Sequence, residues 1–328
     1  MSSRRPRHVR LIRYTCHRSS EFLSADGESL KEETAAARLG SDPVIDLHTH
    51  TTASDGLCTP EELVARAAGA GVSVLSVTDH DTISGCAAAA AACASAGIEF
   101  VAGIEITAVR AATDVHVLGY FISRRSPVFL DFLAAQRRQR IDRVRLMIDR
   151  LADFGVRLDA DAILQPGVAD VEKAAGRPWL ARALVSGGHV KTTNEAFDRW
   201  LSRGRPAFVP RVGATPEAVF AHIHEAGGVA SLAHPGLLAH DEWIPGFVTG
   251  GLDAIEVYHS GHDRDATMRY RELAAKHSLG VSGGSDYHAD GHYGAGGLGG
   301  VSLPRSDFDR LVRLPVPRPG EGKPGPKK

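Results

Sequence analysis

The chain has 328 residues, of which 43% are hydrophobic and 23% charged, a composition typical of a globular protein with a sizeable core. Its 38 Lys and Arg residues against 39 Asp and Glu residues give a net charge of -1, which argues against a general polyanion binder. The unusual feature is histidine: 16 residues beside only four cysteines indicate metal or acid-base chemistry.

The cysteines and apolar runs exclude several protein classes. No Cys-x-x-Cys pair occurs, so neither a zinc finger nor a disulfide framework is expected. The longest apolar stretch, residues 86–96, is alanine-rich and roughly half of the ~20 residues that span a bilayer. We therefore expect a cytoplasmic protein with reduced thiols, no disulfide partner and no membrane span.

The two ends of the chain differ from its middle. Residues 1–42 are expected to be a disordered extension, because residues 1–20 carry six arginines and no acid. An arginine-rich targeting peptide is the alternative interpretation. Residues 304–328 hold six prolines and seven basic residues, which predicts a solvated tail.

Between these ends, short apolar runs alternate with helical patterns, as in parallel βα units. Seven runs predict strands over residues 44–47, 73–77, 98–102, 115–120, 229–233, 254–258 and 279–282. Helix starts are marked at Thr59-Pro60 and Thr215-Pro216, where an N-cap threonine precedes proline and acidic residues. The order of elements predicts an α/β fold.

One interval breaks this alternation, and we expect it to be a small helical insertion over residues 126–211. It opens with an amphipathic, arginine-rich stretch, residues 132–154, whose apolar residues recur at helical spacing. The α/β fold is therefore predicted in two segments, residues 43–125 and 212–303.

Polar residues follow or interrupt the predicted strands. The first strand ends in Asp46-Leu47-His48-Thr49-His50, and histidines two apart on an extended strand point the same way. In a parallel αβ barrel the carboxyl ends of the strands converge on one face, where active sites form. Nine candidate metal ligands are predicted on this face: His48, His50, Asp55, His80, Glu105, His116, His234, Asp286 and His288.

Nine ligands are too many for a single zinc site with an open position. The mixture of imidazole and carboxylate instead predicts two or three divalent ions, with Glu105 as a candidate bridge. Manganese is the expected metal, and iron and zinc are the alternatives.

The motifs IDLHTHTTASDG, LSVTDHDT, GIEIT, VHVLGY, LAHPG and GSDYH together resemble the polymerase and histidinol phosphatase (PHP) superfamily. The similarity spans about Val44 to Leu303. It is greatest to the bacterial 3′,5′-nucleoside bisphosphate phosphatases and a related 5′-to-3′ exoribonuclease. The resemblance implies a distorted (β/α)7 barrel with a small helical insertion, and it gives the nine residues the metal-ligand places. It also implies phosphate ester hydrolysis by metal-activated hydroxide.

The resemblance also bears on the substrate. Arg140, Arg143 and Arg177 match the family pattern and are expected to bind a second substrate phosphate. Trp179 stands where relatives usually carry histidine, and Leu237 stands where they often carry arginine. No catalytic residue beyond the metal ligands is predicted.

We expect an enzyme that hydrolyses phosphate from small nucleotides, either 3′,5′-nucleoside bisphosphates or nucleoside monophosphates. The alternatives are a 5′-to-3′ exoribonuclease on short RNA and a phosphatase for another monoester such as histidinol phosphate. A non-enzymatic alternative is a vestigial, metal-stabilised interaction module, which would not need all nine ligand places filled. His259 and His292 lie near the predicted site and are candidate substrate contacts.

Overall fold

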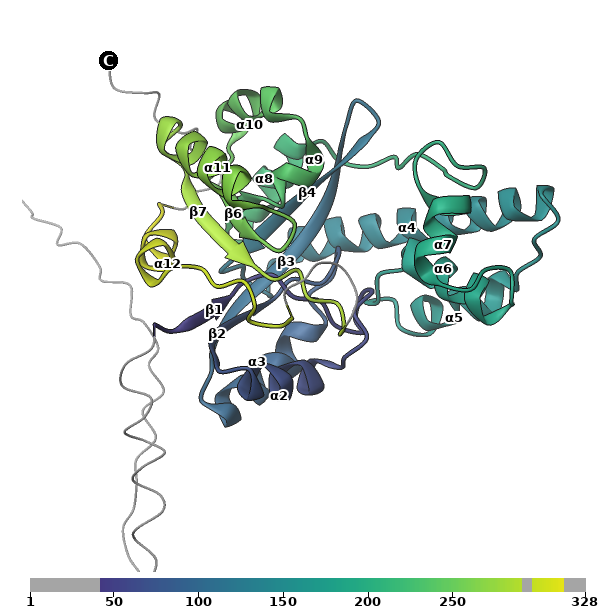
Figure 1. Cartoon of the computed structure of the whole chain (residues 1–328), viewed down its shortest axis with the longest axis horizontal. Helices are drawn as coiled ribbons and strands as arrows, with labels where there is room; N and C mark the ends of the chain where they lie inside the picture. Colours follow the sequence, from purple (N-terminus) through teal and green to yellow (C-terminus); the bar gives the residue numbers. More distant parts are fainter. Residues whose placement is uncertain (1–41, 291–296, 316–328) are drawn as a thin grey trace, which may run out of the picture. The chain divides into compact units, whose positions relative to one another are not determined.

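The computed structural model describes residues 42–290 and 297–315 (Figure 1). Seven strands lie side by side in chain order, β1 to β7. They are β1 (Val44–Asp46), β2 (Val72–Val77), β3 (Glu99–Arg110), β4 (Thr113–Tyr120), β5 (Val229–Leu232), β6 (Ala254–His259) and β7 (Gly280–Gly284). Each of the seven predicted runs overlaps one of these strands.

Backbone contacts bring the first and last strands together. The N–H of Leu47 donates to the carbonyl of Gly283 at 3.2 Å, and the N–H of His50 donates to the carbonyl of Tyr287 at 2.9 Å. The sheet therefore curls round on itself, and the predicted distorted barrel is confirmed.

The fourth strand departs from the parallel arrangement that the sequence predicted. β4 is antiparallel to both β3 and β5, whereas the other neighbouring strands are parallel. Ala111 and Ala112 join β3 directly to β4 with φ of 49° and 59°, the left-handed conformation of a two-residue hairpin. Because this turn reverses the chain, His116 pairs with Thr107 inside β4 rather than following a parallel strand.

Helices cover the outside of the barrel. α2 (Pro60–Gly69) packs on β2, α3 (Gly85–Ala96) on β3, and α8 (Pro216–Glu225) across β3, β4 and β5. α11 (Arg264–Lys276) packs on β6, and α12 (Arg305–Val312) on β7. The shorter α9 (Pro235–Leu238), η2 (Asp241–Trp243) and α10 (Ile244–Gly250) lie between β5 and β6 in the chain.

The helical segment between β4 and β5 has a hydrophobic core of its own. It comprises α4 (Pro127–Asp153), α5 (Ala160–Ala169), α6 (Arg177–Ser186), α7 (Thr193–Ala196) and the π-helical turn η1 (Phe197–Leu201). Its core includes Val144, Leu164 and Leu180, while Phe129 and Leu133 at the start of α4 join the core of the barrel. α4 thus links the two hydrophobic cores. Figure 1 shows this helix running from the barrel into the helical segment.

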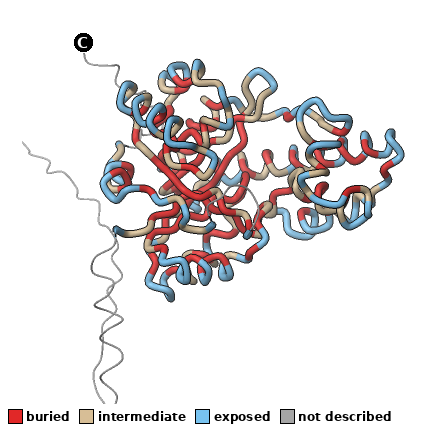
Figure 2. Tube along the Cα trace, viewed as in Figure 1, coloured by how far each residue is buried: buried red, intermediate tan, exposed pale blue. Residues whose placement is uncertain are grey.

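Burial follows this layering, with the strands buried and the outer helix faces exposed (Figure 2). Cys58, Cys86 and Cys93 are buried free thiols. Among the residues that the structure describes, no helix has the length and apolar character needed to cross a membrane. The solvated tail predicted over residues 304–328 is wrong for its first part, because Arg305–Val312 form α12, which buries Phe308 and Leu311 against the barrel. Cys16, His292, residues 1–41 of the predicted N-terminal extension and residues 316–328 of the predicted tail lie outside the described residues.

Gly284 tests how tightly the barrel closes. A Cβ added there would lie 2.3 Å from the backbone nitrogen of His48 and 2.8 Å from Asp46 Oδ1. We expect Gly284→Ala to lower the thermal unfolding midpoint measured by circular dichroism, with a loss of about 1–3 kcal/mol for the overpacked contact.

Gly69→Ala in α2 is the matched control for Gly284→Ala. Nothing lies within 4 Å of its added Cβ, and alanine favours a helix over glycine. Equal unfolding midpoints for the two variants would contradict the close approach of β7 to the end of β1.

Candidate metal centre

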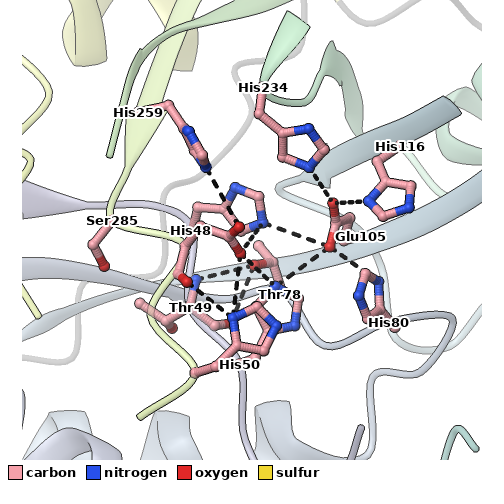
Figure 3. A network of polar contacts seen from close by, with 12 residues as sticks. His48, Thr49, His50, Thr78, His80, Glu105, His116, His234, His259 and Ser285 are labelled. Carbon is pink, nitrogen blue, oxygen red and sulfur yellow. Dashed lines mark hydrogen bonds and ion pairs between the residues drawn. The ribbon is translucent and has the colours of Figure 1, made fainter. Parts of the chain in front are cut away.

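Glu105 on β3 lies at the centre of a group of histidines (Figure 3). Its carboxylate lies within ion-pair distance of five imidazole rings, those of His48, His50, His80, His116 and His234. Oε1 lies 2.8 Å from His116 Nδ1, and Oε2 lies 3.0 Å from His80 Nδ1. The side chain is 1% exposed, so these rings rather than water surround its charge.

Two further carboxylates complete the cluster. Asp286 Oδ1 lies 3.2 Å from Nε2 of both His48 and His50. Asp55 Oδ1 lies 3.4 Å from His288 Nε2, and the His288 ring stacks on that of His50 with centroids 4.1 Å apart. The structure thus brings all nine predicted ligands into one cluster, including His116 from the antiparallel strand.

Two residues of this cluster have backbones that non-glycine residues rarely adopt. φ is 27° at His234 and 54° at Asp286. Such conformations cost about 1–3 kcal/mol each and persist where the surroundings fix them. The N–H of His234 donates to Glu256 Oε2 at 2.7 Å, and Ser285 beside Asp286 donates its N–H to Asp46 Oδ1 at 2.9 Å. Buried carboxylates therefore hold both turns.

Glu256 on β6 is a contributor that the sequence analysis missed. Its Oε1 accepts a hydrogen bond from His48 Nδ1 at 2.9 Å, which leaves His48 Nε2 facing Asp286. Burial would raise the pKa of Glu256, but His48 and its neighbours outweigh burial and lower it. A charged residue inside the apolar run Ala254–Tyr258 is the signal that would have found it, since buried glutamates are rare unless paired.

Asp79 at the end of β2 fixes the loop that carries Asp55. It accepts hydrogen bonds from the N–H of Thr51 at 2.7 Å and the hydroxyl of Ser54 at 2.6 Å. The Ser54 hydroxyl also lies 3.2 Å from Asp55 Oδ1. Asp79 lies in the motif LSVTDHDT, yet only the neighbouring His80 was predicted to act in the site.

The cluster contains buried ring nitrogens without a hydrogen bond. In the described part of the chain these are His48 Nε2, both nitrogens of His50, His80 Nδ1 and His234 Nδ1. A buried polar atom left unpaired costs about 1–3 kcal/mol. Groups of three or four ligand atoms, such as those of His50, Asp55, His80 and His288, lie within 4.8 Å of one another. This donor set fits divalent cations, which would take up the unpaired nitrogens.

The charge balance keeps the carboxylates ionised. Burial would raise the pKa of Glu105, but His80 and the other imidazoles outweigh it and hold the pKa well below its ordinary value. The pKa values of Asp55 and Asp286 are lowered in the same way. Burial lowers the pKa of His80 to about 4, which keeps this ring in the neutral form that binds metals.

The cluster lines one wall of a cavity of about 340 Å³, which we call the main cavity. The opposite wall of this cavity is basic. That wall carries four arginines, Arg140 and Arg143 from α4, Arg177 from α6, and Arg211. Asp114 of β4 lies among them, 3.8 Å from Arg143 and 3.9 Å from Arg177. Four guanidinium groups face Asp114 and Asp81, so the wall favours an anion.

The three arginines predicted to bind substrate differ in their surroundings. Arg140 is 5% exposed, with its Nε bonded to Asp81 at 2.5 Å and its Nη2 to Thr107 Oγ1 at 3.0 Å. Arg143 Nη2 is buried and makes no hydrogen bond to the described residues. Arg177 is 29% exposed on the cavity wall. Arg143 and Arg177 therefore have more donor capacity available for a ligand than Arg140.

Arg211 is a fourth arginine of this wall, and it was not among the predicted substrate-binding residues. Its Nη1 lies 3.6 Å from Asp81 Oδ2, and its Nε is buried without a hydrogen bond to the described residues. Burial, with Arg140 nearby, lowers the pKa of Arg211 to about 9. An incoming anion would relieve this repulsion.

Trp179 and Leu237, the two departures from the family pattern, differ in burial and in what they contact. Trp179 is 8% exposed, and its Nε1–H donates to the carbonyl of Ser54 at 3.0 Å. It therefore connects α6 to the loop that carries Asp55. Leu237 in α9 is 61% exposed and lines the main cavity. Neither side chain offers a charge to a phosphate.

His259, a candidate substrate contact, is buried beside the cluster. It is 5% exposed, and its Nε2 lies 3.4 Å from Asp286 Oδ2. Its ligand atom also groups with those of His48 and Glu256. His259 thus contacts the second oxygen of Asp286, whose Oδ1 faces His48 and His50.

Comparison with known proteins bears on this geometry. The PHP domain model matches residues 46–165. The chain is 35% identical over 255 residues to the 3′,5′-nucleoside bisphosphate phosphatase of Chromobacterium violaceum, covering 76% of this chain and 89% of that protein. The chain belongs to the PHP domain family. It is also 34% identical over 255 residues to the 5′-3′ exoribonuclease Rnm of Escherichia coli, covering 75% and 85% of the two chains.

A solved structure agrees with this membership. A protein of Bifidobacterium adolescentis, proposed to be a metal-dependent phosphoesterase, aligns with a TM-score of 0.75 at 31% identity. The alignment covers 83% of this chain and 97% of that chain. This PHP protein is therefore an enzyme that hydrolyses phosphate esters with the help of metal ions, as the resemblance implied.

Glu256→Gln tests the support of His48. We expect divalent metal to bind about 10–100-fold more weakly, as is typical when the carboxylate partner of a ligating histidine is lost. Titration of the metal-free protein by calorimetry measures the change without any assay of activity.

Glu242→Gln is the matched control, because this exposed glutamate pairs with His240 at 2.7 Å, outside the cluster. Affinities that do not differ between the two variants would show that Glu256 has no part in positioning His48.

Proposed function

We propose that this PHP enzyme removes phosphate from small nucleotides, with 3′,5′-nucleoside bisphosphates as the leading substrate class. One observation carries the proposal: the ligand cluster and the free donors of Arg143 and Arg177 line the same cavity of about 340 Å³. A substrate with two phosphates can thus meet both sites at once. The name of the Chromobacterium violaceum relative supports the same class.

In this proposal the nine clustered residues hold two or three divalent ions, and manganese is the metal we favour. Glu105 would help to hold more than one of these ions, because its two oxygens face different histidines, His116 and His80. Such ions, when bound, lower the pKa of a water and hold the phosphoryl oxygens.

The residues around the ions supply orientation and charge. Arg143 and Arg177 hold the second phosphate, and Asp114 lies within 4 Å of both guanidinium groups and keeps them in place. Asp81 holds the buried Arg140, which contributes positive charge to the wall without a direct contact to the second phosphate. Attack on phosphorus needs little covalent work from side chains, so positioning and electrostatics carry the catalysis.

The arginine wall also bears on the alternative substrates. Histidinol phosphate carries an ammonium group, which four guanidinium groups on one cavity wall would repel. A vestigial binding module has no use for a complete set of nine ligands, Glu105 among them. The small-nucleotide proposal is therefore the better supported one.

The proposal predicts both the metal content and the substrate. Manganese-loaded protein should bind at least two ions per chain and release phosphate from adenosine 3′,5′-bisphosphate. A chelator should abolish release and added manganese should restore it, because the ions are proposed to activate the attacking water. Elemental analysis and a phosphate assay measure the two quantities.

The same assay includes AMP and histidinol phosphate as competing substrates. Phosphate release from neither nucleotide would overturn the nucleotide assignment. Fewer than two ions per chain in manganese-replete buffer would overturn the multinuclear centre.

Arg143→Gln tests the second phosphate site. We expect KM for adenosine 3′,5′-bisphosphate to rise about 10–100-fold, since one charge-assisted hydrogen bond is worth about 1.5–3 kcal/mol. KM for AMP, which lacks the second phosphate, should rise less. Steady-state kinetics on both substrates give the comparison.

Arg145→Gln is the control for this variant, because Arg145 is an exposed arginine of the same helix. A similar rise in KM for both substrates, or none for either, would show that Arg143 does not recognise the second phosphate.

A further inference from the structure

β6 contributes none of the nine predicted metal ligands, although its two neighbours in the sheet lead into three of them. The end of β6 and the turn into α11, residues 259–263, instead carry two imidazole rings, those of His259 and His262, with centroids 5.3 Å apart. One ring contacts Asp286, and the other contacts the backbone just after His234. The turn therefore lies against the two ligand positions whose backbones have positive φ.

The hydrogen bonds of His259 fix the position of its ring hydrogen. Its Nδ1 lies 2.9 Å from the N–H of Gly261, which can only donate, so this nitrogen is the acceptor. The hydrogen of the neutral ring is therefore on Nε2, which lies 3.4 Å from Asp286 Oδ2 and donates to it. A ring nitrogen that carries a hydrogen has no lone pair for a cation. His259 is thus directed at Asp286 rather than at an ion.

This contact makes the two oxygens of Asp286 different. Oδ2 is taken by His259, whose ring points toward the cluster (Figure 3). Oδ1 lies 3.2 Å from Nε2 of both His48 and His50, among the atoms that would hold an ion. Because a bond to one oxygen fixes the plane of a carboxylate, the contact with His259 directs Oδ1 into the centre.

His262 has the opposite ring hydrogen. Its Nδ1 lies 2.9 Å from the carbonyl of Val257, which can only accept, so Nδ1 carries the hydrogen. Its Nε2 accepts a hydrogen bond from the N–H of Gly236 at 3.1 Å. Gly236 is the second residue after His234, so this bond holds the chain as it leaves the strained backbone of that ligand.

The contact between His262 and Gly236 is close. A Cβ added at Gly236 would lie 2.8 Å from Cδ2 of the His262 ring and 2.9 Å from its Nε2. Only glycine lets the backbone approach the imidazole to this distance. Glu256 holds the same turn from its other side, through the N–H of His234. β6 and the turn after it therefore contact the ligand positions through residues 256, 259 and 262.

We propose that the turn between β6 and α11 is a positioning element of the metal centre. His259 orients Asp286, His262 holds the turn that carries His234, and neither ring binds an ion. This inference rests on the proposed function, because it requires that the nine clustered residues hold the ions. Changes at His259 and His262 should therefore weaken the binding of the ions without removing a site.

The test of His259 titrates the metal-free, full-length protein with manganese by calorimetry. We expect His259→Ala to bind manganese about tenfold or more weakly with an unchanged number of ions, as when other partners of ligating residues are lost. Glutamine keeps an N–H that can reach Asp286, so His259→Gln should restore the affinity to within about threefold of wild type. At saturating manganese, kcat of His259→Ala should fall while KM for adenosine 3′,5′-bisphosphate stays unchanged, because the arginine wall is intact.

His262 is tested from both sides of its contact. We expect His262→Ala and Gly236→Ala each to weaken manganese binding about tenfold. The second change should add nothing to the first, because the added Cβ disturbs only the ring that His262→Ala has removed. Losses that add in the double variant would overturn the role of this contact.

His240→Ala is the matched control, because this histidine stacks on Trp243 and pairs with Glu242 outside the cluster. An equal loss of affinity in the control, or no rescue by His259→Gln, would overturn the positioning role. One ion fewer in His259→Ala would overturn it as well, because the ring would then be a ligand. Fewer than two ions in wild type would instead overturn the proposed function.

Nitrogen NMR of histidine-labelled wild type gives a readout that needs no variant. Zinc is the probe here, because it has a filled d shell and leaves the spectra sharp. We expect the hydrogen to stay on Nε2 of His259 and on Nδ1 of His262, with and without zinc. Loss of either hydrogen on zinc binding would overturn the inference, since that ring would bind the ion itself.

Discussion

The carboxylate of Glu105 is the group on which the rest of the site depends. It is buried, and an unpaired charge removed from water is very costly. Five imidazole rings from the ends of β1 and β2, from β4 and from the end of β5 surround it, so the barrel must close around this residue. The fold and the candidate metal centre therefore depend on each other. If the strands did not converge, the Glu105 carboxylate and the imidazole nitrogens would both lack partners.

A second layer of buried acids converts this convergence into a defined geometry. The carboxylates of this layer belong to Asp46, Asp79 and Glu256. They accept hydrogen bonds from backbone N–H groups, hydroxyls and one imidazole next to the centre. The strained backbones of His234 and Asp286 are held by this layer. Ligand positions are thus fixed before any cation arrives, which keeps the cost of reorganisation low when ions bind.

The sequence predicted well what depends on local pattern. Seven apolar runs located the strands, and polar residues near the ends of these runs located the nine clustered residues. The direction of β4 was wrong because two alanines form the hairpin, in place of the Asn-Gly or Asp-Gly pairs that usually mark such a turn. His116 was found nonetheless, since strand periodicity fixes its face in either direction. Glu256 was missed because its partner His48 is 208 residues away in the chain.

The antiparallel strand has a further consequence. Asp114 and His116 lie two residues apart on β4, so their side chains project from the same face. His116 contacts Glu105, and Asp114 contacts Arg143 and Arg177. One step of a pleated strand, about 6–7 Å, therefore separates the metal side of the cavity from its arginine side. In the proposed enzyme, β4 thus sets the distance between the two phosphates that one substrate can present to the metal side and to the arginine side of the cavity at the same time.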